Sequence, residues 1–347
     1  MAAINTALFS YGMSGSVFHA PFIHVHPGFN LYAVLERSKQ SAMERYPGIK
    51  TYKSAEEMLA DKEIELVVVN TPNSTHFDLA RQALQAGKHV IVEKPFTTNL
   101  AEAEELITLA AQNKVQLAVY HNRRWDSDFL TIKKVLSEKL LGDVVEAELH
   151  FDRYKEVISP KKHKEIPGPG TGILFDLGSH LIDQSIVLFG IPEAVFADLR
   201  IVRPVSDVDD YMEVLLYYPT LRVRLKGSYL VREPLPSFSF FGSKGTFIKS
   251  RADVQEDRLQ EAIPPGTENW GMEKESEQGL LHTEINGETI RKNIPTERGD
   301  YMSFYESVYQ ALRNEKPMAV SGTDGLNVMR VLDAAVRSSK EQKVIKL

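Results

Sequence analysis

The sequence of 347 residues contains no cysteine. This absence excludes disulfide bonds, cysteine nucleophiles and thiolate metal ligands, and it fits a cytoplasmic enzyme. Lysine and arginine form no block long enough to follow a nucleic-acid backbone, and the formal net charge is −6. No apolar run approaches the roughly 20 residues that span a membrane, and residues 1–5 lack the basic segment of a secretory signal. We therefore expect a cytoplasmic protein without nucleic-acid or membrane partners.

The length and the 43% hydrophobic content favour a globular protein of two domains. Over residues 1–120, short apolar runs alternate with helical patterns, which predicts a Rossmann domain with a doubly wound parallel sheet. From Val144 onward, apolar and polar residues alternate. This period of two predicts an α+β domain over residues 121–347 with a large, mainly antiparallel, open sheet. The last helix, at about residues 322–339, is a candidate to pack back on the first domain.

A glycine-containing turn follows the first predicted strand and precedes a helix predicted from Ser16. Its sequence, Ser10-Tyr11-Gly12-Met13-Ser14-Gly15, nearly matches G-x-G-x-x-G, with Ser10 at the position of the first glycine. The other two glycines let the backbone approach a pyrophosphate and let the helix pack on the strand. We expect a dinucleotide to bind Gly12, Met13, Ser14 and Gly15.

Two opposing signals for the choice of cofactor follow the second predicted strand. Glu36 lies about twenty residues after Gly15, where a carboxylate accepts hydrogen bonds from ribose hydroxyls. Arg37, Ser38 and Lys39 are instead suited to a 2′-phosphate, because a guanidinium pairs well with phosphate oxygens. An exposed charged turn is the third interpretation. The expected cofactor is NAD or NADP, with a small preference for NADP.

Polar residues follow two buried strands at their carboxyl ends. Thr71-Pro72-Asn73 and His76 follow residues 66–69, and Glu93-Lys94-Pro95 follows residues 90–92. In an open α/β sheet, ligands bind beside these strand ends. We therefore expect Thr71, Pro72, Asn73, His76, Glu93 and Lys94 to line the cofactor, and Lys94 to lie where cofactor and substrate meet. A solvated lysine and a surface or capping histidine remain the alternatives.

A glycine-rich stretch at residues 168–172 leads into an apolar helix that carries Asp176 and His180. Four residues of separation place the carboxylate and the imidazole on one helical face. A histidine titrates near neutral pH and can accept a proton from a hydroxyl. The alternative is a structural capping pair. No metal site is expected, since this spacing supplies too few ligands.

Taken in order, these segments resemble the Gfo/Idh/MocA family of NAD(P)-dependent oxidoreductases over essentially the whole chain. The resemblance rests on Tyr11-Gly12-x-x-Gly15 with His19-Ala20-Pro21, Thr71-Pro72-Asn73 with His76, Glu93-Lys94-Pro95, and Asp176-x-x-x-His180. The run His121-Asn122-Arg123-Arg124-Trp125-Asp126 is similar to a branch that contains NADP-linked scyllo-inositol dehydrogenases. Ser10 departs from the family pattern, and Glu36 before Arg37 departs from the small residues of that branch.

The resemblance implies that Lys94, Asp176 and His180 surround the reacting carbinol. We expect hydride transfer between a nicotinamide cofactor and a secondary hydroxyl of a sugar or inositol-like polyol. In this scheme His180 is the general base, Lys94 stabilises the developing alkoxide, and Asp176 fixes substrate hydroxyls and the His180 ring. The expected substrate-binding residues are Asn122, Arg123, Tyr154, Asp176 and His180.

The sequence also predicts how the protein assembles, and it leaves two alternative functions open. The strands near Glu146–Asp152 and Arg222–Lys226 each have a polar face, which favours a homodimer or homotetramer paired through the second sheet. A regulator that binds dinucleotide without turnover is one alternative function, although it would not need Lys94, Asp176 and His180. An NAD-dependent glycoside hydrolase, which oxidises a sugar transiently, is the other.

Overall fold

The computed structural model describes residues 2–38, 40–159 and 164–347, which form two compact units. Unit 1 contains the chain up to Asn122 together with residues 255–270 and 301–326. Unit 2 contains residues 123–254, 271–300 and 327–347. The first continuous stretch of unit 1 therefore ends at Asn122, and residues 255–270 and 301–326 also belong to that unit. Among the described residues, no helix is long and apolar enough to cross a membrane.

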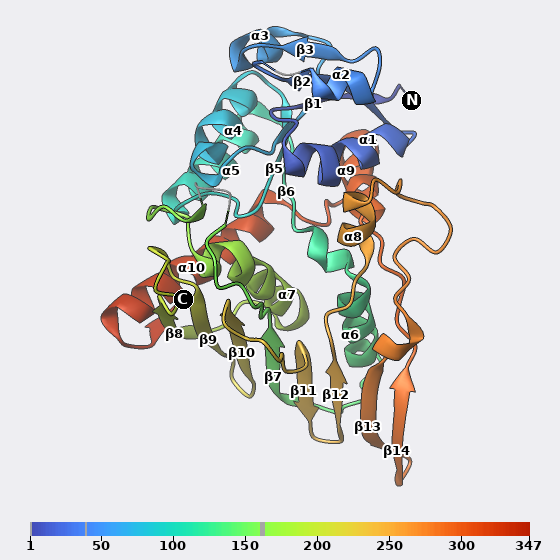
Figure 1. The fold of residues 1–347 in the computed structure, drawn as a ribbon, viewed down its shortest axis with the longest axis vertical. Helices are drawn as coiled ribbons and strands as arrows, with labels where there is room; N and C mark the ends of the chain where they lie inside the picture. Colours follow the sequence, from blue (N-terminus) through green and yellow to red (C-terminus); the bar gives the residue numbers. More distant parts are fainter. Residues whose placement is uncertain (1, 39, 160–163) are drawn as a thin grey trace. The chain divides into compact units, whose positions relative to one another are not determined.

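Unit 1 is built on a sheet of six parallel strands in the order β3-β2-β1-β4-β5-β6. This order is that of a dinucleotide-binding doubly wound sheet, so the predicted Rossmann architecture is confirmed. Figure 1 shows α4 and α5 on one side of these strands and α1 and α9 on the other. The strands are β1 (Ile4–Leu8), β2 (Phe29–Leu35), β3 (Lys50–Tyr52), β4 (Leu66–Val69), β5 (His89–Val92) and β6 (Leu117–Val119). The helices before β6 are α1 (Ala20–Val25), α2 (Ser41–Arg45), α3 (Ala55–Ala60), α4 (His76–Gln85) and α5 (Leu100–Asn113).

Local sequence signals explain where these elements begin and end. The valine side chains of β4 are fully buried, as expected for a central parallel strand. Ser54 Oγ accepts a hydrogen bond from the Glu57 amide at 3.2 Å, and Asn99 Oδ1 accepts one from the Glu102 amide at 3.0 Å. Ser54 and Asn99 are thus the N-caps of α3 and α5.

The second and third segments of unit 1 complete its aromatic core. They contain α8 (Gln255–Gln260) and α9 (Met302–Asn314). Tyr305 of α9 stacks on Phe22 with ring centroids 5.3 Å apart, and it meets the edge of Phe29 at 6.2 Å. All three of these aromatic rings are buried. Helix α9 thus supplies a core side chain to unit 1, although Tyr305 follows Phe22 in the sequence by about 280 residues.

Unit 2 contains a nine-stranded sheet in the order β14-β13-β12-β11-β7-β10-β9-β8-β15. Only β7 and β10 pair in parallel, so the predicted, mainly antiparallel sheet is confirmed. Its strands are β7 (Val144–His150), β8 (Ala194–Arg200), β9 (Tyr211–Tyr217), β10 (Arg222–Ser228), β11 (Phe238–Gly242), β12 (Gly245–Lys249), β13 (Gly279–Ile285), β14 (Glu288–Ile294) and β15 (Ile345–Lys346). Its helices are α6 (Ser127–Ser137), α7 (Ser179–Phe189) and α10 (Gly322–Glu341), of which α10 begins in unit 1. The Ser338 hydroxyl of α10 accepts a hydrogen bond from the Ala197 amide of β8 at 2.9 Å.

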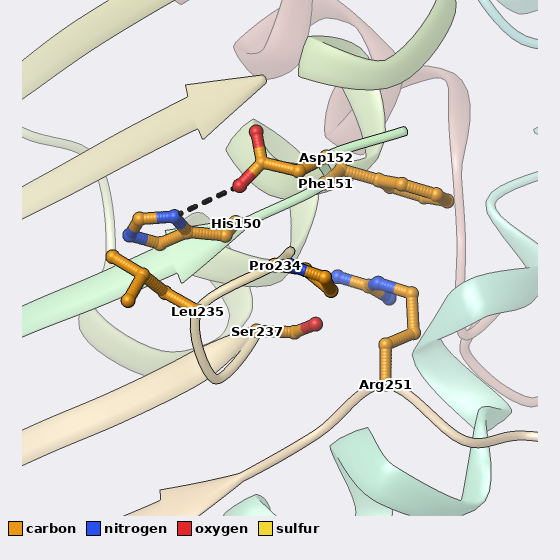
Figure 2. A pocket seen from close by; sticks show the side chains of 7 residues that line it. All are labelled: His150, Phe151, Asp152, Pro234, Leu235, Ser237 and Arg251. Carbon is orange, nitrogen blue, oxygen red and sulfur yellow. Dashed lines mark hydrogen bonds and ion pairs between the residues drawn. The ribbon is translucent and has the colours of Figure 1, made fainter. Parts of the chain in front are cut away.

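Strand β7 follows the predicted alternation in its centre and departs from it at both ends. Ala147 and Leu149 are fully buried, but Val145 is 51% exposed because the β7–β11 register shifts at Phe241 and Gly242. At the other end, His150 is buried although its position predicts an outward side chain. Its Nδ1 lies 3.2 Å from Asp152 Oδ2 in a small cavity of about 190 Å³ (Figure 2). The cavity is lined by His150, Phe151, Asp152, Pro234, Leu235, Ser237 and Arg251.

Candidate active site

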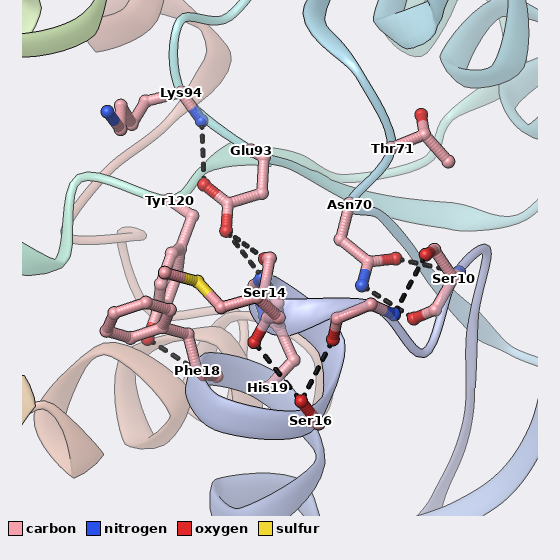
Figure 3. A network of polar contacts seen from close by, with 12 residues as sticks. Ser10, Ser14, Ser16, Phe18, His19, Asn70, Thr71, Glu93, Lys94 and Tyr120 are labelled. Atoms are coloured by element: carbon pink, nitrogen blue, oxygen red, sulfur yellow. Dashed lines mark hydrogen bonds and ion pairs between the residues drawn. The ribbon is translucent and has the colours of Figure 1, made fainter. Parts of the chain in front are cut away.

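The turn after β1 is the predicted phosphate-binding segment, and only glycine fits at its end. A Cβ on Gly15 would collide with the Ser10 carbonyl and lie 2.7 Å from Asn70 Nδ2. Asn70, at the end of β4, holds Ser10 on both sides: its Oδ1 accepts from the Ser10 amide at 3.1 Å, and its Nδ2 donates to the Ser10 carbonyl at 2.8 Å (Figure 3). The Ser10 hydroxyl accepts from the Gly12 amide at 3.1 Å, so serine is compatible with the turn. These close backbone approaches fit a dinucleotide.

The helix after this turn begins as a π-helical turn at Ser14–His19 rather than as the α-helix predicted from Ser16. Ser14 and His19 both reach the carboxylate of Glu93 (Figure 3). Ser14 Oγ donates to Glu93 Oε1, and His19 Nε2 lies 3.0 Å from the same oxygen. π-helical turns are frequent at functional sites because they redirect side chains. Here the turn directs two side chains toward the end of β5.

Glu93 is a carboxylate with 13% of its side chain exposed, and it stays ionised. Burial alone would raise the pKa of Glu93, but His19, Ser14 and Lys94 outweigh it and lower the pKa to about 2. Glu93 Oε2 also accepts a hydrogen bond from the Lys94 amide at 3.1 Å. The backbone of the predicted catalytic lysine is therefore fixed by the same carboxylate that accepts from Ser14 in the predicted phosphate-binding segment.

His19 connects Glu93 with the aromatic core of unit 1. Its Nε2 lies 3.0 Å from Glu93 Oε1, and its Nδ1 lies 2.8 Å from the hydroxyl of Tyr305. The Tyr305 hydroxyl also lies 2.8 Å from the Phe18 carbonyl, which accepts a hydrogen bond from the Tyr120 hydroxyl at 2.9 Å. His19 thus links the end of β5 to α9.

His76 joins the ends of β4 and β5 in a different way. Its Nδ1 lies 2.9 Å from the Pro95 carbonyl, and its Nε2 lies 2.9 Å from the Thr71 carbonyl. Complete burial lowers the pKa of His76, and neither carbonyl offers the full charge that stabilises an imidazolium. The neutral ring has one N–H and serves one of the two carbonyls at a time. His76 thus connects Thr71, a predicted cofactor-lining residue, with Pro95 at the end of β5.

Glu36 and Arg37 are neighbours in the sequence but have different environments in the structure. Glu36 is buried, and its Oε2 accepts a hydrogen bond from the Ala42 amide at 3.1 Å, at the start of α2. Arg37 is exposed, and Lys39 lies outside the described residues. At least one oxygen of the Glu36 carboxylate therefore serves the protein's own helix, whereas Arg37 stays accessible at the same strand end.

The second predicted group of residues lies in unit 2, at a π-helical turn, Leu174–Gly178, that leads into α7. Asp176 is in this turn, and its Oδ1 accepts from Lys164 Nζ at 2.7 Å. The Tyr229 hydroxyl lies 3.5 Å from Asp176 Oδ2. His180, the second residue of α7, is 5% exposed, and its ring centroid lies 6.5 Å from that of Phe151. The structure thus adds Lys164 and Tyr229 to the surroundings of Asp176.

The glycine-rich segment before this turn has a specific steric role. Gly172 has φ of 89°, and a Cβ there would meet Asp209 Oδ1 at 2.5 Å. The Asp209 carbonyl accepts from the Ile173 amide at 2.8 Å. Burial raises the pKa of the Asp209 carboxyl. A glycine at position 172 therefore lets Asp209 hold the start of the helix that carries Asp176 and His180.

Of the other predicted substrate-binding residues, two contact side chains of the protein itself and one is buried. Arg123 Nη1 lies 3.3 Å from Asp126, and the ring of Tyr154 is covered by the Arg232 guanidinium at 4.0 Å. Asn122 is buried. Beside them, Arg124 forms a bidentate ion pair with Asp183 of α7, the shortest N–O distance being 2.6 Å. This pair fixes the segment that follows Asn122 to the helix of His180.

Sequence reasoning did not assign roles to Lys164, Tyr229 or Tyr305. Asn70 belongs to the polar run after β4, where polar groups are expected near the cofactor, but its contact with Ser10 was not predicted. Tyr305 had no usable signal, because its partner His19 lies 286 residues away. The predicted residues Gly12, Ser14, Gly15, Glu93 and Lys94 all lie in one region of unit 1, where Met13 is 45% exposed beside them.

The first unit is a Rossmann sheet with a glycine-containing turn and a lysine whose backbone is fixed, and the second unit has a large open sheet. This combination defines a two-domain NAD(P)-dependent oxidoreductase. Residues 4–121 match the family model of the oxidoreductase family's NAD-binding Rossmann fold, and residues 133–347 match that of its C-terminal alpha/beta domain. The chain belongs to the Gfo/Idh/MocA oxidoreductase family. It is an enzyme of that family, and its cofactor is NAD or NADP.

Individual relatives match along nearly the full length. The chain is 36% identical to scyllo-inositol 2-dehydrogenase (NADP(+)) IolW of Bacillus subtilis, over 99% of this chain and 96% of the relative. Among solved structures, an oxidoreductase of Bacteroides fragilis is 46% identical with a TM-score of 0.91, covering 99% of this chain and 100% of that one. The oxidoreductase YvaA of Bacillus subtilis is 36% identical with a TM-score of 0.96, covering 100% and 99%.

Proposed function

We propose that this enzyme oxidises a secondary hydroxyl of a sugar or an inositol-like polyol, or reduces the corresponding ketone. The observation that carries the proposal is the ionised Glu93, which fixes the backbone of Lys94 at the carboxyl end of β5. The name of the Bacillus subtilis relative, scyllo-inositol 2-dehydrogenase (NADP(+)), supports a polyol substrate. The bound nicotinamide cofactor would supply the hydride acceptor or donor.

The protein's own side chains would position the alcohol and move its proton. We assign His180 as the general base for the hydroxyl proton and Lys94 as the cation that stabilises the developing alkoxide. Asp176 would hold substrate hydroxyls through the polar group that it forms with Lys164 and Tyr229. Gly12, Met13, Ser14, Gly15, Thr71, Pro72, Asn73 and His76 would bind or support the cofactor, with Glu93 anchoring Lys94.

The first test is a screen for cofactor reduction. Purified enzyme is incubated with inositols, aldoses and linear polyols, each with NAD⁺ and with NADP⁺, and absorbance of the reduced cofactor is followed. The expected result is turnover of at least one cyclic polyol or sugar that is lost in Lys94→Ala. Absence of turnover with every alcohol and of reduction with the matching ketones would reject the proposal. Release of nitrophenol from a nitrophenyl glycoside would show glycoside cleavage instead.

The second test asks whether Lys94 and His180 act on the same proton. His180→Ala should lower turnover by roughly 10²–10⁴, the usual size of general-base catalysis, while cofactor affinity changes little. Lys94→Ala should be similarly slow. The double variant should lose much less than the product of the two single losses, because residues that act as a unit are not additive. Strictly multiplicative losses would show that the two residues act independently.

A further inference from the structure

Three arginine side chains surround a single phenylalanine ring in unit 2. The guanidinium carbons of Arg123, Arg153 and Arg251 lie 5.3, 5.1 and 4.3 Å from the centroid of the Phe151 ring. Phe151 is 7% exposed, and its ring is the one that lies 6.5 Å from the ring of His180. Cations over an aromatic face are attracted by its quadrupole, which offsets part of their mutual repulsion. The group therefore concentrates positive charge beside the proposed general base.

Two of these arginines share one interior carboxylate. Arg123 Nη1 lies 3.3 Å and Arg251 Nη1 lies 3.6 Å from Asp126 Oδ2. Arg251 is also held between two rings, since its guanidinium lies 4.6 Å from the centroid of Phe238. Burial raises the pKa of Asp126 well above its usual value, Asp253 and Asp128 act in the same direction, and Arg123 and Arg251 oppose them. Arg123 and Arg251 are thus tied to the interior of unit 2.

Arg153 differs from Arg123 and Arg251 because no carboxylate pairs with it among the described residues. Residues 160–163, which lie outside the described residues, have the sequence Pro-Lys-Lys-His and contain no acidic residue. Its side chain is half-buried, and its backbone is fixed to the end of β10. The Arg153 amide donates to the Ser228 carbonyl at 2.9 Å, and its carbonyl accepts from the Val231 amide at 3.0 Å. A fixed backbone and a cation without an acidic partner are the features expected of a ligand-binding arginine.

The surroundings connect Arg153 with Asp176. Tyr229, whose hydroxyl lies 3.5 Å from Asp176, accepts at its carbonyl a hydrogen bond of 2.8 Å from the Lys155 amide, two residues after Arg153. Burial and the charge of Arg153 lower the pKa of Lys155, whereas Asp176 acts in the opposite direction. Burial and Asp176 raise the pKa of Tyr229, and Arg153 opposes them. Arg153 is therefore within electrostatic range of the groups around Asp176, together with Lys164 and Arg203, which also act on Lys155.

We propose that Arg153 determines substrate specificity by binding a pair of acceptor oxygens on the substrate. This inference rests on the proposed function. The guanidinium is planar and presents two parallel N–H donors, so its natural partners are the two oxygens of a carboxylate or two neighbouring hydroxyls of a ring. A sugar acid and a neutral cyclic polyol both offer this arrangement. Arg153 would hold either one beside Asp176 and His180.

The test measures ligand binding apart from turnover. Enzyme saturated with reduced cofactor is titrated calorimetrically with D-glucuronate, D-glucose and myo-inositol as probes, and kcat and KM are measured for any probe that is a substrate. Arg153→Gln should weaken binding of the best probe about 10–100-fold, the scale of hydrogen bonds to a charged group, and should raise KM more than it lowers kcat. Arg153→Lys should restore carboxylate binding in part and diol binding little, which distinguishes the two classes. Cofactor affinity should stay the same in both variants.

Arg330→Gln is the matched control, because Arg330 is exposed on α10 and its guanidinium contacts only the Asn327 side-chain oxygen at 3.3 Å among the described residues. It should leave all three titrations unchanged. The proposal is overturned if no probe binds the wild-type enzyme, if Arg153→Gln binds as tightly as wild type, or if its effect falls on cofactor affinity. If probes bind through Arg153 but no alcohol is oxidised, the proposed function fails and the assignment of Arg153 stands. Circular dichroism of each variant verifies that it is folded.

Discussion

Glu93, with its hydrogen-bonded carboxylate, should make the stability of unit 1 depend on pH in a predictable way. Its carboxyl pKa falls from 4.5 in the reference state to about 2 in the folded protein. At 1.36 kcal/mol for each pKa unit, this difference stabilises the folded state by about 3 kcal/mol. Because the folded pKa is the lower one, the contribution is complete above pH 4.5 and is lost as the pH falls toward 2. Glu93→Gln should remove it at neutral pH.

The measurement is urea denaturation of wild type and Glu93→Gln between pH 7 and pH 3, in the background Trp125→Phe. The chain has two tryptophans, so this background leaves Trp270, which belongs to unit 1, as the only fluorescent tryptophan. The variant should lose about 3 kcal/mol at pH 7, and the loss should shrink as the pH falls below 4.5. Glu104→Gln, an exposed position on α5, is the control and should change stability by less than about 0.5 kcal/mol. A loss of unfolding free energy that is the same at pH 7 and pH 3 would refute the assignment of Glu93 as an ionised carboxylate that accepts three hydrogen bonds.

Two further predictions concern cofactor and assembly. Arg37→Ala should weaken NADP binding by about 1–2 kcal/mol and leave NAD binding nearly unchanged, and equal losses in a titration would reject this role. The protein should form a homodimer or homotetramer through the sheet of unit 2, which a monomeric mass in light scattering at micromolar concentration would exclude.

Local patterns predict much of the fold. Strand β4, from Leu66 to Val69, has the bounds expected from its run of β-branched residues. The hairpin at Asn286-Gly287 forms with φ of 54° and 81°, as the two turn residues require. Ser321 and Asp324 cap α10 reciprocally. Each of these features is decided within four or five residues, so composition and spacing contain the necessary information.

The site is predicted less completely, because its remaining parts depend on distant segments. The π-helical turns at Ser14–His19 and Leu174–Gly178 have no local signature. The ion pair of Lys164 with Asp176 requires a loop conformation that residue types alone do not specify. The contacts of His19 are made with Glu93 and Tyr305, which are far from it in the chain. Whether Lys94 and His180 act together stays a prediction that the kinetic test must decide.

The return of α9 to unit 1 has a consequence for synthesis on the ribosome. The parallel strands of unit 1 have all been translated by residue 119, but Tyr305, which completes the core against Phe22 and supports His19, is made about 180 residues later. At roughly 5–20 residues per second, the nascent sheet waits on the order of 10–40 s for that side chain. During this interval the ring of Phe22 lacks its stacking partner and the His19–Glu93 pair lacks its third member. The cofactor-binding unit, although first in the sequence, is thus finished among the last parts of the protein.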